Sequence, residues 1–137
     1  MPTLPSKPTA RGRTDLTRAA ATSVSASEIL RERVLAALEE LKARDVRLID
    51  VRGKTSIADT LVIASGTSTR HVKALADEVV KFVKQAGMFP LGVEGQSEAE
   101  WVLVDLGDVI VHVMLPRIRE FYGLERLWSV EAAEAAG

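Results

Sequence analysis

The chain has 137 residues, no cysteine and two histidines, which excludes a disulfide framework and a cysteine nucleophile and leads us to expect no metal and no cofactor. Its 47% of hydrophobic and 27% of charged residues are ordinary for a soluble domain, and no apolar run approaches the ~20 residues that cross a bilayer, so we expect a cytoplasmic protein without membrane contact. The net charge of −1 is uneven, because residues 94–137 hold three basic and nine acidic side chains, a balance that favours a basic protein partner over nucleic acid.

The first 26 residues are expected to form a disordered tail outside the fold. They are rich in Pro, Thr, Ser and Ala and show no sustained hydrophobic period. An organelle transit peptide is the alternative, because the segment holds arginines and a single acidic residue. We expect one folded domain over residues 27–130 and a second short tail over residues 131–137.

A helix and two strands are expected in the first part of the domain. Ser25 and Glu28 have the spacing of a capping box, which opens a helix that ends near residues 44–45. Residues 46–51 read as a strand. Residues 61–64 form a continuous apolar run, typical of a central strand that is buried on both faces.

A turn and a long amphipathic helix follow these strands. Gly66, Thr67 and Ser68 form the turn, and the helical spacing of apolar residues then continues until Gly87 ends the helix. Serine and threonine at such a turn usually cap the helix, and the alternative is an anion held by the turn. His71 lies in the first helical turn and is expected to face solvent.

A tight β-hairpin is expected around the pair Gly107-Asp108, which two valine-rich segments flank. One face of the hairpin then carries six core residues: Val102, Val104, Leu106, Val109, Val111 and Val113. The other face carries Trp101, Leu103, Asp105, Ile110, His112 and Met114. Unpaired Asp and His side chains are costly to bury, so specific contacts cover this second face or a partner binds to it. His112 is expected to bond to Asp105 or to a backbone carbonyl, unless either side chain contacts the partner.

The remaining segments complete a mixed α/β (α+β) fold. A short strand over residues 91–93 precedes the hairpin, and Pro116 opens a last helix that is interrupted near Gly123 and closes at Leu127-Trp128. The order helix, strand, strand, helix, three strands, helix predicts a mixed sheet of about five strands with helices packed on it.

Five motifs succeed one another along the chain at a characteristic spacing. They are Asp59 ahead of its strand, the turn Ser65–Ser68, the pair Glu94-Gly95, the segment Trp101–His112, and the ending Arg119, Phe121-Tyr122, Leu124-Glu125 and Leu127-Trp128. Together they resemble the Iojap family, whose bacterial members are ribosomal silencing factors, and the resemblance covers residues 28–129. Within the motifs, Gly95 is expected to serve the backbone of a turn.

The resemblance implies a translation regulator with a fold similar to that of nucleotidyltransferases. Family members dock on large-subunit protein fourteen and block joining of the small ribosomal subunit when nutrients run short, and organelle relatives act in large-subunit assembly. The expected partner-binding residues are Glu94, Trp101, Val102, Leu103, Asp105, His112, Tyr122 and Trp128. A minor contact with ribosomal RNA and a homodimer of the free protein are further expectations.

The likeness to nucleotidyltransferases raises an enzymatic alternative. Those enzymes hold a triphosphate at a glycine-serine turn and a metal ion on two carboxylates one residue apart on a strand. The turn at Gly66 matches the first element. Asp105 and Asp108 are three residues apart across a hairpin turn, so they point to opposite faces and are poor joint ligands. We therefore expect a protein without catalytic activity.

Overall fold

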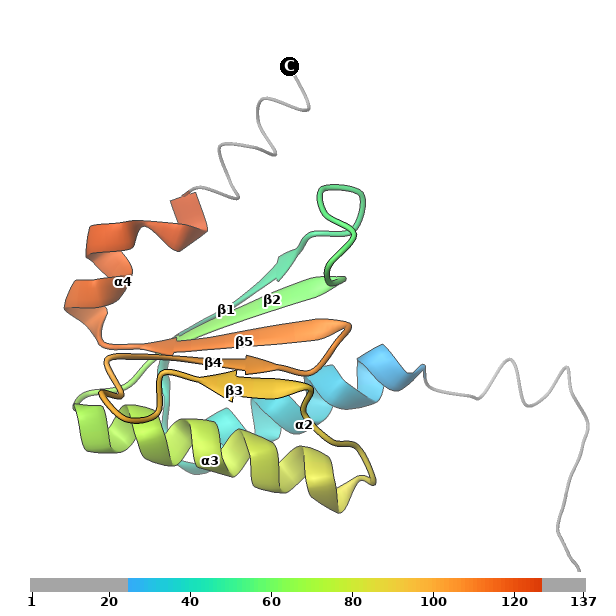
Figure 1. Ribbon diagram of the computed structural model, residues 1–137, viewed down its shortest axis with the longest axis horizontal. Helices are drawn as coiled ribbons and strands as arrows, with labels where there is room; N and C mark the ends of the chain where they lie inside the picture. Colours follow the sequence, from blue (N-terminus) through green and yellow to red (C-terminus); the bar gives the residue numbers. More distant parts are fainter. Residues whose placement is uncertain (1–24, 127–137) are drawn as a thin grey trace, which may run out of the picture.

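The computed structural model describes residues 25–126, which fold into three helices and one five-stranded sheet (Figure 1). The elements are α2 (Ala26–Glu40), β1 (Arg44–Asp50), β2 (Thr60–Ser65), α3 (Thr69–Gln85), β3 (Gly92–Glu94), β4 (Trp101–Asp105), β5 (Val109–Met114) and α4 (Pro116–Tyr122). The mixed α/β fold and the order of its elements are confirmed, with boundaries that differ from the predicted ones by a few residues. The predicted C-terminal tail and Trp128 lie outside the described residues, as does almost all of the N-terminal tail.

The sheet has the strand order β1-β2-β5-β4-β3. Its central strands β2 and β5 run parallel, and the other neighbouring strands are antiparallel. All six residues of β2 are buried, as the apolar run predicted for a central strand. Helices α2 and α3 lie side by side along one face of the sheet, and α4 lies at the end where β5 finishes (Figure 1).

The core lies between the sheet and helices α2 and α3. The six hairpin residues predicted for the core face are all buried there, and Leu106 N–H donates to the Val109 carbonyl at 2.9 Å, which closes the predicted two-residue turn. From α3 the buried residues recur at helical spacing: Val72, Leu75, Ala76, Val79 and Val83. The apolar residues of the hairpin, which recur every two residues, and those of α3, which recur every 3.6 residues, therefore pack into one core.

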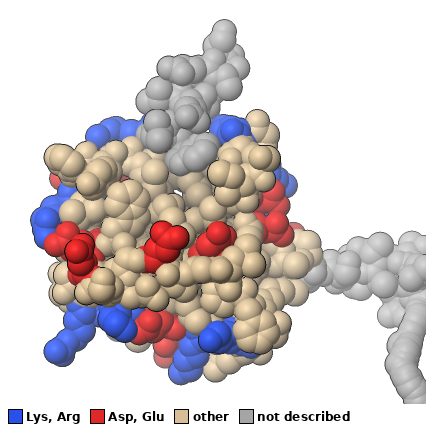
Figure 2. Space-filling model, viewed as in Figure 1, with Lys and Arg blue, Asp and Glu red and all other residues tan. Residues whose placement is uncertain are grey.

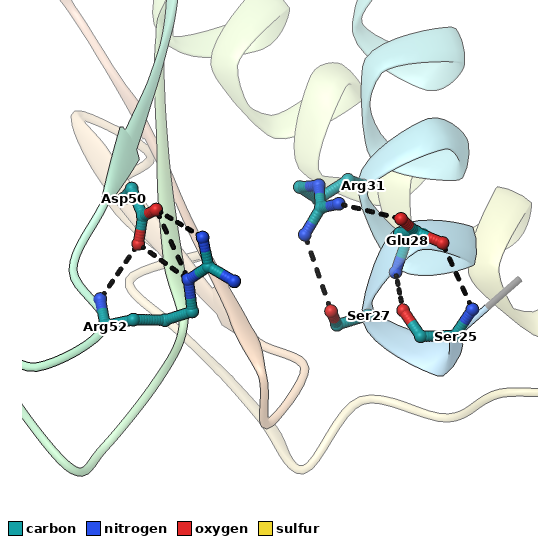
Figure 3. Close-up of polar contacts among 6 residues, drawn as sticks. All are labelled: Ser25, Ser27, Glu28, Arg31, Asp50 and Arg52. Carbon is teal, nitrogen blue, oxygen red and sulfur yellow. Dashed lines mark hydrogen bonds and ion pairs between the residues drawn. The ribbon is translucent and has the colours of Figure 1, made fainter.

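The predicted capping box opens α2. Ser25 Oγ accepts from Glu28 N–H at 3.1 Å, and Ser25 N–H donates to the Glu28 carboxylate at 3.2 Å (Figure 3). Two backbone donors that the helix cannot satisfy internally are thus paired. The helix then buries one face, made of Leu30, Val34, Ala37 and Leu38, against the sheet and α3.

Strand β1 is an exposed edge strand whose bulge and charged side chains hinder pairing with a further strand. Its register slips between Arg44 and Arg47, where Asp45 has a φ of 50°, so the strand carries a bulge. At its other end Arg52 forms a 2.7 Å ion pair with Asp50 (Figure 3), and this guanidinium lowers the pKa of the Asp50 carboxyl to about 2. Bulges and charged side chains on an edge hinder the addition of a further strand.

His71 joins the start of α3 to the end of α2, contrary to the expectation that it faces solvent. Its Nε2 lies 2.7 Å from the Leu41 carbonyl oxygen, and its Nδ1 accepts from Thr67 N–H at 2.9 Å. This pattern assigns the ring proton to Nε2. This contact could not be predicted from local sequence patterns, because Leu41 lies thirty residues earlier and approaches His71 only when the two helices pack together.

Replacing His71 by alanine is expected to lower the free energy of unfolding by about 1.5 kcal/mol, because the Leu41 carbonyl and the Thr67 N–H both lose a partner. Urea unfolding followed by circular dichroism would measure the change. The neighbouring exposed residue offers a control, Arg70→Ala, which should alter stability by less than about 0.5 kcal/mol. Equal losses in the two variants would contradict a specific role for the imidazole.

Candidate partner-binding site

Three aromatic rings cluster where β4 begins and α4 ends. The ring centroids of Trp101 and Tyr122 lie 5.1 Å apart, and Phe121 meets Tyr122 edge-on at 5.0 Å. Trp101 is half-buried, whereas Tyr122 and Phe121 are 58% and 78% exposed. Exposed aromatic groups of this kind dominate the energetics of protein interfaces. Phe121 was not among the predicted site residues, although its place beside Tyr122 in the last helix could have indicated it.

The indole of Trp101 is held from behind by His112. Trp101 Nε1–H donates to His112 Nδ1 at 2.9 Å, and the two ring centroids lie 5.9 Å apart. His112 is only 7% exposed, and burial lowers its pKa to about 4, so the imidazole is neutral at pH 7. Since Nδ1 accepts the indole proton, the imidazole carries its own proton on Nε2.

Of the two partners expected for His112, Asp105 or a backbone carbonyl, Asp105 was wrong, because no bond joins the two side chains. Asp105 instead accepts the backbone N–H of Gly107 at 2.9 Å. A short carboxylate readily reaches the chain two residues ahead of it in a turn, and this local contact wins over the more distant diagonal one. Asp105 thus shapes the hairpin turn, and it remains half-exposed on the same face as Trp101.

The loop between β3 and β4 depends on Gly95, as expected. Gly95 has a φ of 92°, and a Cβ at this position would clash with the carbonyl oxygen of Trp101. Its own carbonyl accepts from Ala99 N–H at 2.9 Å. The backbone carbonyl of the next loop residue, Glu100, accepts a hydrogen bond from Leu115 N–H at 2.9 Å. This bond ties the loop to the start of α4.

A shallow pocket of about 190 Å³ opens between this loop and α4. Its lining residues are Gly95, Glu98, Glu100, Trp101, Ile118 and Tyr122. Glu100 forms a 3.2 Å ion pair with Arg117, and Glu98 is exposed. Carboxylates beside the faces of two aromatic rings attract a cationic side chain, through charge and through cation–π contact.

Acidic residues surround the aromatic cluster. Glu94 is exposed and pairs with Leu103 across β3 and β4, so it borders the half-exposed surface of β4. Figure 2 shows Asp and Glu side chains gathered over the strands in the middle of this view, with most Lys and Arg side chains towards its periphery. Such a surface is complementary to a basic partner.

Two residues expected to bind the partner are in fact covered. Val102 is fully buried on the face of the sheet that α2 and α3 cover, because alternation along β4 turns it away from Trp101. His112 lies beneath the indole rather than at the surface. The remaining expected residues are placed on the outer surface, except Trp128, which lies outside the described residues.

The turn before α3 serves as a cap. Ser68 Oγ accepts His71 N–H at 3.1 Å, and Gly66 N–H donates to the Met114 carbonyl at 3.0 Å. Thr67 N–H is likewise committed to His71. A Cβ on Gly66 would approach Val72 N to 2.9 Å, so glycine allows the turn to pack onto the helix. These backbone donors are bonded to the protein itself, which argues against an anion site.

Two further features bear on the kind of site. Within residues 25–126, no three His, Asp or Glu side chains lie close enough together to hold a metal ion. Over the same range, no helix has the length and apolar character needed to cross a membrane.

Arg119 ties α4 to the sheet through a buried clamp. Its guanidinium donates to Ser65 Oγ at 2.8 Å and forms a two-pronged bond with the Glu125 carboxylate at 2.7 and 2.9 Å. This bond lowers the pKa of the Glu125 carboxyl. Arg119 is 8% exposed and lies three residues before Tyr122, so the clamp fixes the helix that carries the exposed rings.

Acid is expected to weaken the fold through His112. Its pKa is about 4 in the folded chain and near the ordinary value of 6.5 when unfolded, so the unfolded state takes up the proton first as the pH falls. The free energy of unfolding is therefore highest above pH 6.5, where the ring is neutral in both states. It falls between pH 6.5 and pH 4, where only the unfolded state binds the proton. Between pH 7 and 5.5 the free energy of unfolding should fall by about 1 kcal/mol.

Urea unfolding at a series of pH values would measure this slope. The variant His112→Asn lacks the buried imidazole and should have a correspondingly flatter profile. Identical profiles for the two proteins would show that His112 is not the group responsible.

Comparisons with known proteins show which family this chain is similar to. The sequence profile of the family described as "Ribosomal silencing factor during starvation" matches residues 24–136. A ribosomal silencing factor from Haemophilus influenzae is 46% identical over 98 residues, covering 72% of this chain and 96% of the relative. One from Chromobacterium violaceum is 47% identical over 93 residues, covering 68% and 76%.

A mouse protein and a solved structure extend these likenesses. The mouse protein, named mitochondrial assembly of ribosomal large subunit protein 1, is 38% identical over 98 residues, which cover 69% of this chain and 43% of the relative. A crystal structure of a Chromobacterium violaceum protein superposes with a TM-score of 0.74 at 43% identity, covering 77% of this chain and 88% of that one.

Proposed function

Since this chain belongs to the family of ribosomal silencing factors, we propose that it binds the large ribosomal subunit and blocks joining of the small subunit, which represses translation when nutrients are limiting. The partner that we propose on the subunit is large-subunit protein fourteen, as the resemblance to the Iojap family implies. Such a protein acts in the cytoplasm, bound to ribosomes, by occupying a surface and without catalysis.

The observation that supports this proposal is the acid-bordered aromatic cluster. We define the docking surface as Glu94, Glu98, Glu100, Trp101, Leu103, Asp105, Phe121 and Tyr122. It combines large exposed rings, which bury much area at little entropic cost, with carboxylates that suit the basic side chains common in ribosomal proteins. The pocket beside Trp101 and Tyr122 would receive one such basic side chain.

Several finer expectations belong to the same proposal. The binding unit is residues 27–130, and Trp128 would add to the docking surface. Contact with ribosomal RNA is minor, because the docking surface is acidic and phosphates would be repelled from it. A homodimer of the free protein would cover the exposed rings in the absence of ribosomes.

A subunit-joining assay tests the proposal. Purified large subunits are incubated with the protein, small subunits are added, and the fraction of joined ribosomes is read by sedimentation. We expect joining to fall as the protein is added, and to be restored by substitutions in the docking surface. Phe89→Ala is a matched control, since Phe89 is also an exposed aromatic residue, 68% accessible, but lies by the hairpin-turn end of the sheet.

A role in large-subunit assembly is the second candidate, and the name of the mouse relative supports it. Binding to the subunit without any effect on joining, together with precursor subunits that accumulate when the protein is absent, would favour assembly. Isothermal titration with a nucleoside triphosphate and magnesium addresses the enzymatic alternative, and heat of binding there would count against a purely surface-binding protein.

A further inference from the structure

His112 is a buried polar residue that the docking surface does not expose. It lies on central strand β5, opposite Leu103 on β4 and Ile63 on β2, so its backbone is fixed on both sides. The residue is only 7% exposed, and its Nδ1 lies 2.9 Å from Trp101 Nε1. A ring in this place can act on a partner only through the residue that covers it.

We infer that His112 is a positioning residue, which holds the indole of Trp101 in its docking orientation without touching the partner itself. This inference rests on the proposed docking role of Trp101. It changes the role of His112 from a contact residue, as the sequence suggested, to a support for the contact residue.

The geometry around the indole carries the inference. Both the His112 and the Tyr122 rings pack near the Trp101 indole, with ring centroids 5.9 and 5.1 Å from it. A half-buried indole needs an acceptor for its N–H, and His112 Nδ1 supplies one on a strand that cannot shift. The indole is thus restrained both by a directed hydrogen bond and by ring packing, which reduces the entropy lost when a partner binds.

The carboxylate of Asp105 cannot replace His112 as the acceptor of the indole N–H. Asp105 is on the same strand and face as Trp101, but its carboxylate accepts the Gly107 N–H in the hairpin turn. The acceptor on His112 is also the neutral form of the ring, which burial favours. The acceptor nitrogen of His112, its position on β5 and its burial therefore all favour the hydrogen bond with Trp101.

The first test observes the indole directly, in free protein. With Trp128→Phe as background, Trp101 gives the only indole N–H resonance in the nuclear magnetic resonance spectrum. Two variants are compared: His112→Asn, whose amide oxygen can accept near the position of Nδ1, and His112→Leu, which has similar bulk and no acceptor. We expect the resonance and its slow solvent exchange to be kept in the Asn variant and lost in the Leu variant.

The second test is a double-mutant cycle on binding to purified large subunits. His112→Leu should weaken binding about tenfold, and His112→Asn less than about threefold. In the background Trp101→Phe, which has no indole N–H, His112→Leu should have little further effect, because the bond it removes is already absent. Circular dichroism of each variant at the assay temperature shows whether it is folded.

The outcomes separate the inference from the proposed function. The inference is overturned if His112→Leu leaves the indole resonance unchanged, or if it weakens binding equally in the Trp101 and Trp101→Phe backgrounds, as a direct contact with the partner would. If Trp101→Ala and wild type bind subunits equally well, the proposed docking surface fails, whereas the indole spectrum still decides whether His112 positions the ring.

Discussion

Replacing Trp101 by alanine is expected to weaken binding to large ribosomal subunits by about 2 kcal/mol or more, roughly a thirtyfold loss of affinity. The substitution removes the half-buried ring at the centre of the aromatic cluster, together with one wall of the acidic pocket. It also removes one of the two aromatic rings that pack against Tyr122. Co-sedimentation of the protein with purified large subunits, over a range of protein concentrations, measures the affinity.

The control for this substitution must separate binding from folding. Circular dichroism and a melting curve show whether the Trp101→Ala chain keeps its structure, since the His112 imidazole loses its hydrogen-bond donor. Phe89→Ala removes an exposed ring from the loop between α3 and β3, outside the docking surface, and should bind as the wild type does. Full recovery of subunits by a folded Trp101→Ala protein would refute the docking surface.

Replacing Arg119 by alanine is expected to lower the free energy of unfolding by about 3 kcal/mol, because the buried Ser65 hydroxyl loses its bond to Arg119 and the partly buried Glu125 carboxylate keeps only its longer ion pair with Arg47, at 3.7 Å. Binding to subunits should weaken too, since the clamp holds the helix that presents Phe121 and Tyr122. Urea unfolding followed by circular dichroism gives the stability, and co-sedimentation gives the binding.

Two variants sharpen the interpretation of the clamp. Arg117 lies on the same helix and pairs with Glu100 at the surface, so Arg117→Ala should cost less than about 1 kcal/mol. Arg119→Lys keeps the charge but cannot form the two-pronged bond, and it should recover only part of the stability. A lysine variant as stable as the wild type would show that charge alone, rather than the fork of the guanidinium, holds α4.

Local patterns in the sequence were sufficient to predict the elements of the fold. The alternation around Gly107 defined the hairpin and its core face, and the helical stripe up to Gly87 defined α3, because each pattern is repeated over many residues. The contacts that tie these elements together were not predicted. Arg119 reaches Ser65 across 54 residues and His71 reaches Leu41 across 30, and such pairings are decided by tertiary packing.

The predicted set of partner-binding residues differs from the observed surface at two positions, Val102 and His112. The aromatic residues and the acidic residues around them do come together, as the motifs implied. Val102 was assigned both to the core face and to the partner-binding set, and the pleat of β4 permits only the first. For His112, Asp105 and a backbone carbonyl were the expected partners, whereas the observed partner of its Nδ1 is the indole of Trp101, diagonally across the hairpin.

The two edge strands of the sheet limit the kind of contact that the protein can make with a partner. At one edge β1 is bulged and charged, and at the other β3 is three residues long, so neither offers a long, regular row of free backbone groups. Association must then depend on separate side chains rather than on a shared ladder of backbone bonds. Such contacts can be made and broken one group at a time, so they are compatible with the reversible binding to the large subunit that we propose.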